Sequence, residues 1–128
     1  MQKIVLKGTV FSGKGEGRKF IDLLWVKKQI EEKLGFTPYS GTLNIRLNEG
    51  SIKNKKLLEK VHRFEIFPEK GFCTGILVKA RIDSLECAII IPEISNYPKQ
   101  VLEIIAHLYL REQLHITDGD QIAVTVNT

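Results

Sequence analysis

Residues 71–91 have the sequence GFCTGILVKARIDSLECAIII, in which two apolar runs stand on either side of a short polar break. Runs rich in β-branched residues and bounded by turn residues favour strands. We therefore predict strands over residues 71–83 and 86–91, joined as a hairpin about Ser84-Leu85. This hairpin is the centre of a fold that we expect to be mainly β.

Further strands are predicted on both sides of the hairpin. In residues 42–47, Leu43, Ile45 and Leu47 alternate with polar residues, which is the two-residue period of a half-buried strand. Other strands are expected at residues 4–11, 63–67 and 121–126. One sizeable helix is predicted over residues 22–34, a short helix within 48–63 and a helical turn at 111–114, whereas residues 101–110 fit a strand or a helical turn equally well.

Many short strands with one sizeable helix indicate a closed or nearly closed β-barrel. The chain has 128 residues, which predicts a single domain over residues 1–128. Its 43% hydrophobic and 27% charged residues are typical of a soluble globular protein. We find no signal-peptide pattern and no apolar stretch near the roughly 18 residues of a spanning helix, so we expect a cytoplasmic protein without membrane contact.

A glycine-rich segment, GKGEGR at residues 13–18, is the first candidate site. Its spacing matches neither the P-loop nor the Rossmann fingerprint. Backbone N–H groups between small residues, together with Lys14, Arg18 and Lys19, can nevertheless hold phosphates, and the net charge of +4 suits an anionic ligand. The alternative from the residues alone is a flexible connection between elements.

Two further candidates lie on predicted strands. Thr42 and Asn44 share one strand face about 7 Å apart along the backbone, and such oxygens suit Mg²⁺ when phosphates supply its other ligands. Glu103, inside the apolar run LEII, is either the outward residue of a half-buried element or a positioned base. For both candidates, a solvated strand face remains the alternative.

Other residue types offer less chemistry. The three histidines show no metal-ligand spacing, and Cys73 and Cys87 fit a strand core better than a nucleophile's site. The basic run Lys53, Lys55, Lys56, Lys60 and Arg63 lacks interleaved aromatics, which indicates a solvated face rather than a platform for single-stranded nucleic acid.

In this order along the chain, the motifs resemble the archaeal CTP-dependent riboflavin kinase family. The resemblance runs from about Gly8 to Val126 and is carried by GKGEGR (13–18), LGFTPYSGTLN (34–44), EIIA (103–106), LREQ (110–113) and DGD (118–120). It implies a closed six-stranded cradle-loop β-barrel with one or two short helices. The implied reaction moves the γ-phosphoryl of CTP to the 5′-hydroxyl of riboflavin, giving FMN and CDP.

The resemblance also implies roles for individual residues. Thr42 and Asn44 would hold Mg²⁺, Ser95 and Glu103 would contact the flavin, and Glu103 would act as the catalytic base. The nucleotide would be bound by Gly13, Lys14, Gly15, Glu16, Gly17, Arg18, Leu108, Tyr109, Leu110 and Arg111.

Two positions depart from the family pattern. Ser95 stands where Thr is expected, which keeps the hydroxyl, and His107 stands where Pro is expected, beside the stretch that would read the cytosine. We therefore expect His107 to bear on the preference for CTP rather than on the transfer of the phosphoryl group.

The partners expected are riboflavin or FMN and CTP or CDP, with a monomeric protein that binds no nucleic acid. One alternative is a nucleic-acid-binding barrel, because LHITDGDQI at residues 114–122 resembles the end of swapped-hairpin DNA-binding barrels. The other is a flavin-binding module without catalysis.

Overall fold

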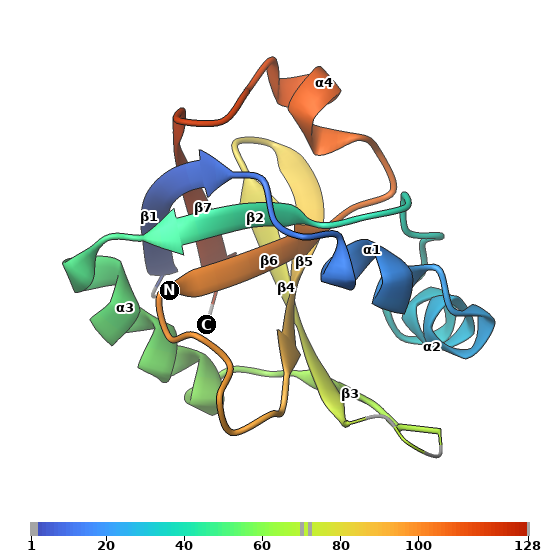
Figure 1. The fold of residues 1–128 in the computed structure, drawn as a ribbon. Helices are drawn as coiled ribbons and strands as arrows, with labels where there is room; N and C mark the ends of the chain where they lie inside the picture. The colour runs from blue at the N-terminus through green and yellow to red at the C-terminus, as the bar shows by residue number, and fades with distance from the viewer. Residues whose placement is uncertain (1–2, 70, 72, 128) are drawn as a thin grey trace.

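Antiparallel strands form a closed barrel in the computed structural model, which describes residues 3–69, 71 and 73–127 (Figure 1). The strands are β1 Lys3–Phe11, β2 Leu43–Leu47, β3 Phe64–Ile66, β4 Gly75–Ile82, β5 Leu85–Pro92, β6 Val101–Ile105 and β7 Gln121–Asn127. Six of them follow the order β4, β5, β6, β2, β1, β7 around the barrel, and β7 meets β4 again at the pair Arg81 and Thr125. The six-stranded barrel expected from the sequence is confirmed.

The barrel interior is filled by the alternating apolar residues of these strands. Leu43, Ile45 and Leu47 of β2 point inward beside Leu102 and Ile104 of β6, and all five are buried. The polar residues between them therefore lie on the outer wall of the barrel, because successive side chains of a strand point to opposite faces.

A second apolar cluster lies against that outer wall. It joins Ile21, Val26 and Ile30 to outward-facing residues of the sheet such as Leu77 and Ile105. The helices concerned are α1 Glu16–Ile21 and α2 Leu24–Leu34, which Figure 1 shows together on one side of the barrel. The outer wall is thus covered here rather than solvated.

The helical part of the chain differs from the prediction. The helix expected over residues 22–34 is preceded by α1 and begins only at Leu24, because Leu23 has an extended backbone (φ −66°, ψ 131°). The other helices of the described residues are α3 Glu49–Lys55 and α4 Leu110–Leu114, with a 3-10 turn, η1, at Lys56–Lys60. The ambiguous run at 101–110 resolves into both alternatives, since β6 ends at Ile105 and α4 begins at Leu110.

The central hairpin is confirmed, with its turn one residue earlier than expected. Ile82 pairs with Leu85, so Asp83 and Ser84 form the turn. Asp83 has φ 53°, a left-handed conformation that Asp tolerates better than most residues.

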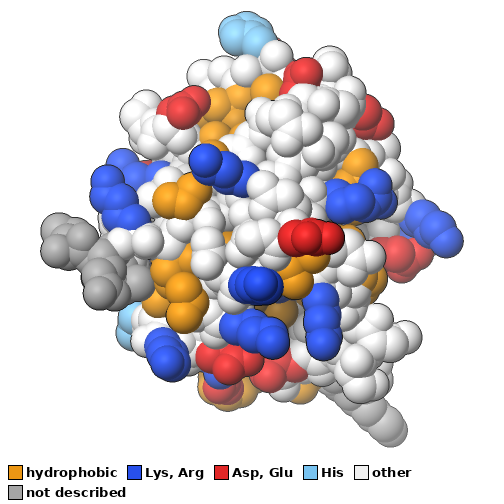
Figure 2. All heavy atoms as spheres, turned by 90° about the vertical axis from the view of Figure 1, so that its left-hand side faces the viewer, with side chains coloured by type: hydrophobic (Ala, Val, Ile, Leu, Met, Phe, Trp, Pro, Cys, Tyr) orange, Lys and Arg blue, Asp and Glu red, His pale blue; other side chains and the backbone are white. Residues whose placement is uncertain are grey.

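The basic run is exposed, with one exception. Lys53, Lys56, Lys60 and Arg63 are exposed, as expected, whereas Lys55 is half-buried and turns toward β6. Figure 2 shows the face that carries β1 and α3, where Lys and Arg side chains stand at the surface among scattered apolar ones. No helix of the described residues is long and apolar enough to span a bilayer.

Candidate active site

Three oxygen-bearing side chains meet on the outer wall of the barrel. Asn44 of β2 stands directly opposite Glu103 of β6 in the antiparallel register. The hydroxyl of Thr42, just before β2, lies 2.9 Å from Asn44 Oδ1 and 3.0 Å from Glu103 Oε1, and can donate its one proton to either. All three residues are half-buried. The structure therefore brings together candidates that lie 61 residues apart in the chain.

The glycine-rich segment packs directly on this cluster. A Cβ added to Gly17 would lie 2.5 Å from both Thr42 Oγ1 and Glu103 Oε1, and a Cβ on Gly13 would collide with the amide of Asn44. Real Cβ atoms do not approach other atoms so closely, so a side chain at either position would displace the cluster. Glycine is required at these two positions because backbone approaches the polar side chains.

The sequence predicts a loop over this segment, whereas the structure is helical from Glu16 onward. Gly15 adopts φ 85° and caps α1, so Gly17 and Arg18 belong to the first helical turn. Arg18 Nε donates to Ser40 Oγ at 3.2 Å, which ties α1 to the turn before β2. Lys14 and Glu16 are exposed.

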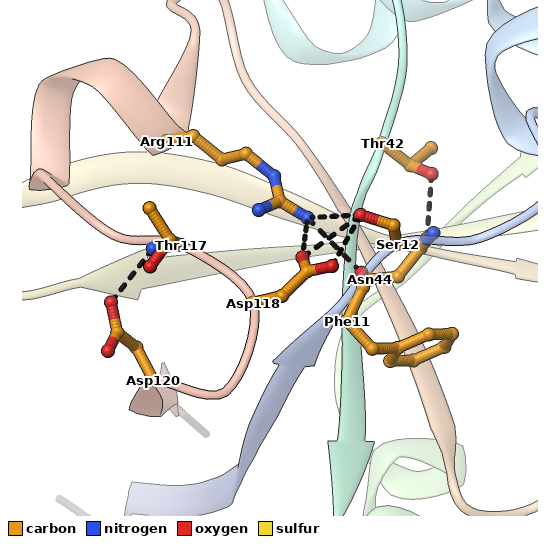
Figure 3. Close-up of polar contacts among 8 residues, drawn as sticks. All are labelled: Phe11, Ser12, Thr42, Asn44, Arg111, Thr117, Asp118 and Asp120. Carbon is orange, nitrogen blue, oxygen red and sulfur yellow. Dashed lines mark hydrogen bonds and ion pairs between the residues drawn. The ribbon is translucent and has the colours of Figure 1, made fainter.

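Ser12, Arg111 and Asp118 form a cluster of hydrogen bonds and an ion pair, here called the polar knot. It ties the chain just before this segment to α4. Arg111 forms an ion pair with Asp118 at 2.7 Å and also donates to the carbonyl of Phe11 at 3.3 Å, while Ser12 Oγ donates to Asp118 Oδ2 at 2.8 Å (Figure 3). The Ser12 hydrogen bond, followed by the Arg111 contacts, lowers the pKa of Asp118 below its ordinary value of 3.8. The end of β1, directly before the glycine-rich segment, is thus in contact with α4, which carries Arg111.

A small pocket of about 60 Å³ opens between these elements. It is lined by Thr42, by Ala106 and by the predicted residues Leu108, Tyr109, Leu110 and Arg111, together with Tyr39, Ser40, Gly41, Leu43 and Ile104. The Tyr39 and Tyr109 rings stack at its edge, with centroids 5.1 Å apart and planes 17° from parallel. Sequence reasoning missed Tyr39, although an aromatic residue just before Ser40-Gly41-Thr42 was a usable signal.

A larger cavity of about 350 Å³ lies beside Lys55 and Tyr97. Its lining includes Ile52, Lys55, Ile91, Ile94 and Tyr97, from α3, β5 and the loop that follows β5. Ser95 is exposed in that loop. The hydrogen bond that reaches Glu103 from the loop comes instead from Tyr97, whose hydroxyl donates to Oε2 at 2.5 Å.

Lys55 borders the same cavity. Its Nζ donates to the carbonyl of Val101 at 2.8 Å and lies 5.3 Å from the centre of the Tyr97 ring. Burial lowers the pKa of Lys55, and the negative charge of Glu103 opposes that shift. Sequence reasoning missed both Lys55 and Tyr97, because neither belongs to a recognisable motif.

The donor set fits magnesium rather than a soft metal. The described residues contain no group of three or more His, Cys, Asp or Glu that could hold a metal ion. Thr42 Oγ1 and Asn44 Oδ1, however, lie 2.9 Å apart. Two oxygens at adjacent octahedral positions of Mg²⁺ are separated by about 2.9 Å, because each bond measures about 2.0–2.1 Å at right angles.

His107 lies beside the small pocket but is not part of its lining. Its side chain is exposed, and its ring lies 6.2 Å from that of Phe36. It can act on the pocket through the backbone that joins Ala106 to Leu108.

The fold and the polar cluster define a small antiparallel β-barrel protein whose candidate ligand site lies on the outer wall, between a glycine-rich segment and two strands. The family model of CTP-dependent riboflavin kinases, described as "Domain of unknown function DUF120", matches residues 10–126. The chain belongs to this family.

Curated relatives carry the name riboflavin kinase. That of Archaeoglobus fulgidus is 40% identical over 130 residues, covering 96% of this chain and 54% of the relative. Those of Pyrobaculum islandicum and Ignicoccus hospitalis are each 38% identical over 96% of this chain and 60% and 71% of their own lengths. This chain therefore spans little more than half of the length of the Archaeoglobus and Pyrobaculum proteins.

Proposed function

We propose that this chain is a riboflavin kinase that transfers the γ-phosphoryl group of CTP to the 5′-hydroxyl of riboflavin, giving FMN and CDP, with Mg²⁺. The observation that carries the proposal is the meeting of Thr42, Asn44 and Glu103 beneath the glycine-rich segment. Membership of the family and the names of its relatives support the same reaction.

Phosphoryl transfer suits a site of this kind, because it needs alignment and charge neutralisation more than covalent chemistry from the protein. The 5′-oxygen of riboflavin attacks the γ-phosphorus, the bond from that phosphorus to the bridging oxygen breaks, and CDP leaves with the electron pair. Glu103 Oε1 accepts the proton of the attacking hydroxyl. Thr42 and Asn44 would hold Mg²⁺, which would supply charge neutralisation for the phosphate oxygens.

The nucleotide is assigned to the side of the cluster with the small pocket. Residues 13–18 hold the phosphates through backbone N–H groups and Arg18, and residues 108–111 border the base. The contact of Arg111 with Phe11 and Ser12 supports this assignment, since it holds residue 111 against the chain directly before Gly13. The stacked Tyr39 and Tyr109 rings offer an aromatic face beside the pocket.

Riboflavin is assigned to the larger cavity, which has a size usual for small-molecule sites. Its apolar lining from Ile52, Ile91 and Ile94 suits the flat ring system, and the exposed Ser95 follows Ile94 directly in the chain. Glu103 contacts Thr42, which lines the small pocket, and Tyr97, which lines the larger cavity, and these two contacts support its assignment as the base.

The test is one incubation of the protein with riboflavin, Mg²⁺ and each of CTP, ATP, GTP and UTP, scored for FMN. We expect FMN with CTP and little with the others. FMN with ATP as well would retain the kinase and contradict the CTP preference, with the backbone at His107 as the feature to examine. No FMN with any nucleotide, from folded protein, would refute the proposal.

Two further measurements separate the alternatives. A flavin-binding module without catalysis would bind riboflavin tightly with no nucleotide requirement. A nucleic-acid-binding barrel would bind DNA with an affinity that falls steeply as salt is raised.

A further inference from the structure

Both carboxylate oxygens of Glu103 have a partner, and the two partners differ in kind. Oε1 faces Thr42 and the glycine-rich segment, where the phosphates are assigned. Oε2 accepts a hydrogen bond of 2.5 Å from the Tyr97 hydroxyl, which comes from the loop between β5 and β6. The two contacts therefore hold the carboxylate with Oε1 toward Thr42 and Oε2 toward Tyr97.

We propose that Tyr97 is a positioning residue that holds Glu103 in its reactive orientation beside the cavity assigned to riboflavin. The inference rests on the proposed function and adds a positioning residue to it. Tyr97 is suited to this role because it belongs to both features, with its hydroxyl on the base and its side chain in the lining of the 350 Å³ cavity.

The tyrosine is held from several sides. The Lys55 ammonium lies 5.3 Å from the ring centre and is itself anchored on the Val101 carbonyl. The Tyr97 backbone N–H donates to the carbonyl of Ile94 at 3.2 Å, which closes a turn within the loop. A donor fixed in this way loses little conformational entropy when it orients the carboxylate.

The phenol also stays a donor under working conditions. Burial, with the hydrogen bond to Glu103 as the next cause, raises the pKa of Tyr97 far above its ordinary value of 10.0. Hydrogen bonds to a charged acceptor are stronger than neutral ones, so removal of this donor leaves the Thr42 contact alone to orient the carboxylate.

The ring and the hydroxyl are expected to have separable effects. Tyr97→Phe keeps the ring in the cavity and removes only the donor, so kcat should fall about 10-fold or more while the riboflavin dissociation constant changes less than about twofold. Tyr97→Ala removes the cavity wall as well, so riboflavin binding should weaken by about 10-fold.

The experiment measures kcat and KM for FMN formation, riboflavin affinity from flavin fluorescence without nucleotide, and the melting temperature. Thr37→Val is the matched control, because it also removes a hydroxyl that donates to a glutamate, Glu31, but at the exposed end of α2. We expect that control to retain the wild-type kcat.

A double-mutant cycle distinguishes positioning from a structural role. In a Glu103→Gln background, Tyr97→Phe should cause no further loss of kcat, because the base that it orients is gone. An equal loss in both backgrounds, or an unchanged kcat in Tyr97→Phe alone, would overturn the inference while the kinase stands. Wild-type protein that binds riboflavin but forms no FMN would overturn the proposed function and this inference together.

Discussion

At the scale of single residues, Glu103 is an outward-facing strand residue whose side chain is nevertheless half-buried. Its position between Leu102 and Ile104 makes it an outward-facing strand residue, as the alternation predicts. The outer wall at this point is covered by α1, however, and Gly17 lies against the carboxylate. The side chain is therefore outward-facing and half-buried at once, which is the setting in which a carboxylate can be positioned.

Replacing Glu103 by Gln tests its assignment as the base. The amide keeps the size of the side chain but cannot accept the proton of the riboflavin hydroxyl, so turnover should fall by ~10²-fold or more. CTP affinity, measured by calorimetry, should stay nearly unchanged. Weaker riboflavin binding with normal turnover would assign Glu103 to binding alone.

The paired change Thr42→Val and Asn44→Leu tests the magnesium site. Both replacements remove the oxygens and keep the approximate volumes, so the fold should survive while activity supported by Mg²⁺ is lost. FMN formation is followed over a series of Mg²⁺ concentrations, with circular dichroism melting as the check on folding. A double variant that still responds to Mg²⁺ like the wild type would contradict the assignment.

At the scale of elements, α1 lies close against Thr42 and Glu103 because Gly17 has no side chain. Its Ile21 end is buried in the outer apolar cluster, which holds its Gly17 end on Thr42 and Glu103. The helix has six residues, and its orientation comes from this packing rather than from helix propensity.

Gly17→Ala and Gly15→Ala should have different consequences. Alanine at 17 suits a helix but crowds Thr42 and Glu103, so we expect kcat to fall about 10-fold or more with little change in melting temperature. Alanine at 15 meets open space but must adopt φ 85°, which costs about 1 kcal/mol of stability. Kinetics and thermal melting of the two variants compare these effects. Normal kcat in Gly17→Ala would show that the close packing is not required.

At the scale of the whole molecule, the barrel brings three distant segments into one site. These segments are β2 with Asn44, β6 with Glu103, and the polar knot before β7. They come together because β6, β2, β1 and β7 are successive neighbours around the barrel. The knot of Ser12, Arg111 and Asp118 joins the end of β1 to α4 and to the turn before β7.

This knot predicts a pH dependence of folding stability. Because the pKa of Asp118 is lowered in the folded protein, the carboxylate stabilises the fold at pH values above 3.8, and this contribution is lost as the pH falls through the folded pKa. Asp118→Asn should therefore lower the melting temperature at pH 7. The difference from wild type should shrink as the pH falls below 3.8 and through the lowered pKa of the folded protein. A constant difference across that range would show that the ionised state of Asp118 does not contribute.

Much of the molecule follows from the sequence because its causes are local. Two-residue alternation in residues 42–47 and the apolar runs of residues 71–91 predict strands and the face that each residue takes. The motifs also bring Thr42, Asn44, Glu103 and the glycine-rich segment into consideration as site residues. The boundary between α1 and α2 was missed, because it depends on the single extended residue Leu23.

The tertiary structure alone decided how these residues meet. The register of β2 against β6 places Asn44 opposite Glu103, barrel packing lays Gly17 on both Thr42 and Glu103, and a loop with no motif brings Tyr97 to the other carboxylate oxygen. The physical reason is that pattern along a chain reports the face of a strand, whereas strand register and the path of a loop depend on contacts between segments far apart in sequence.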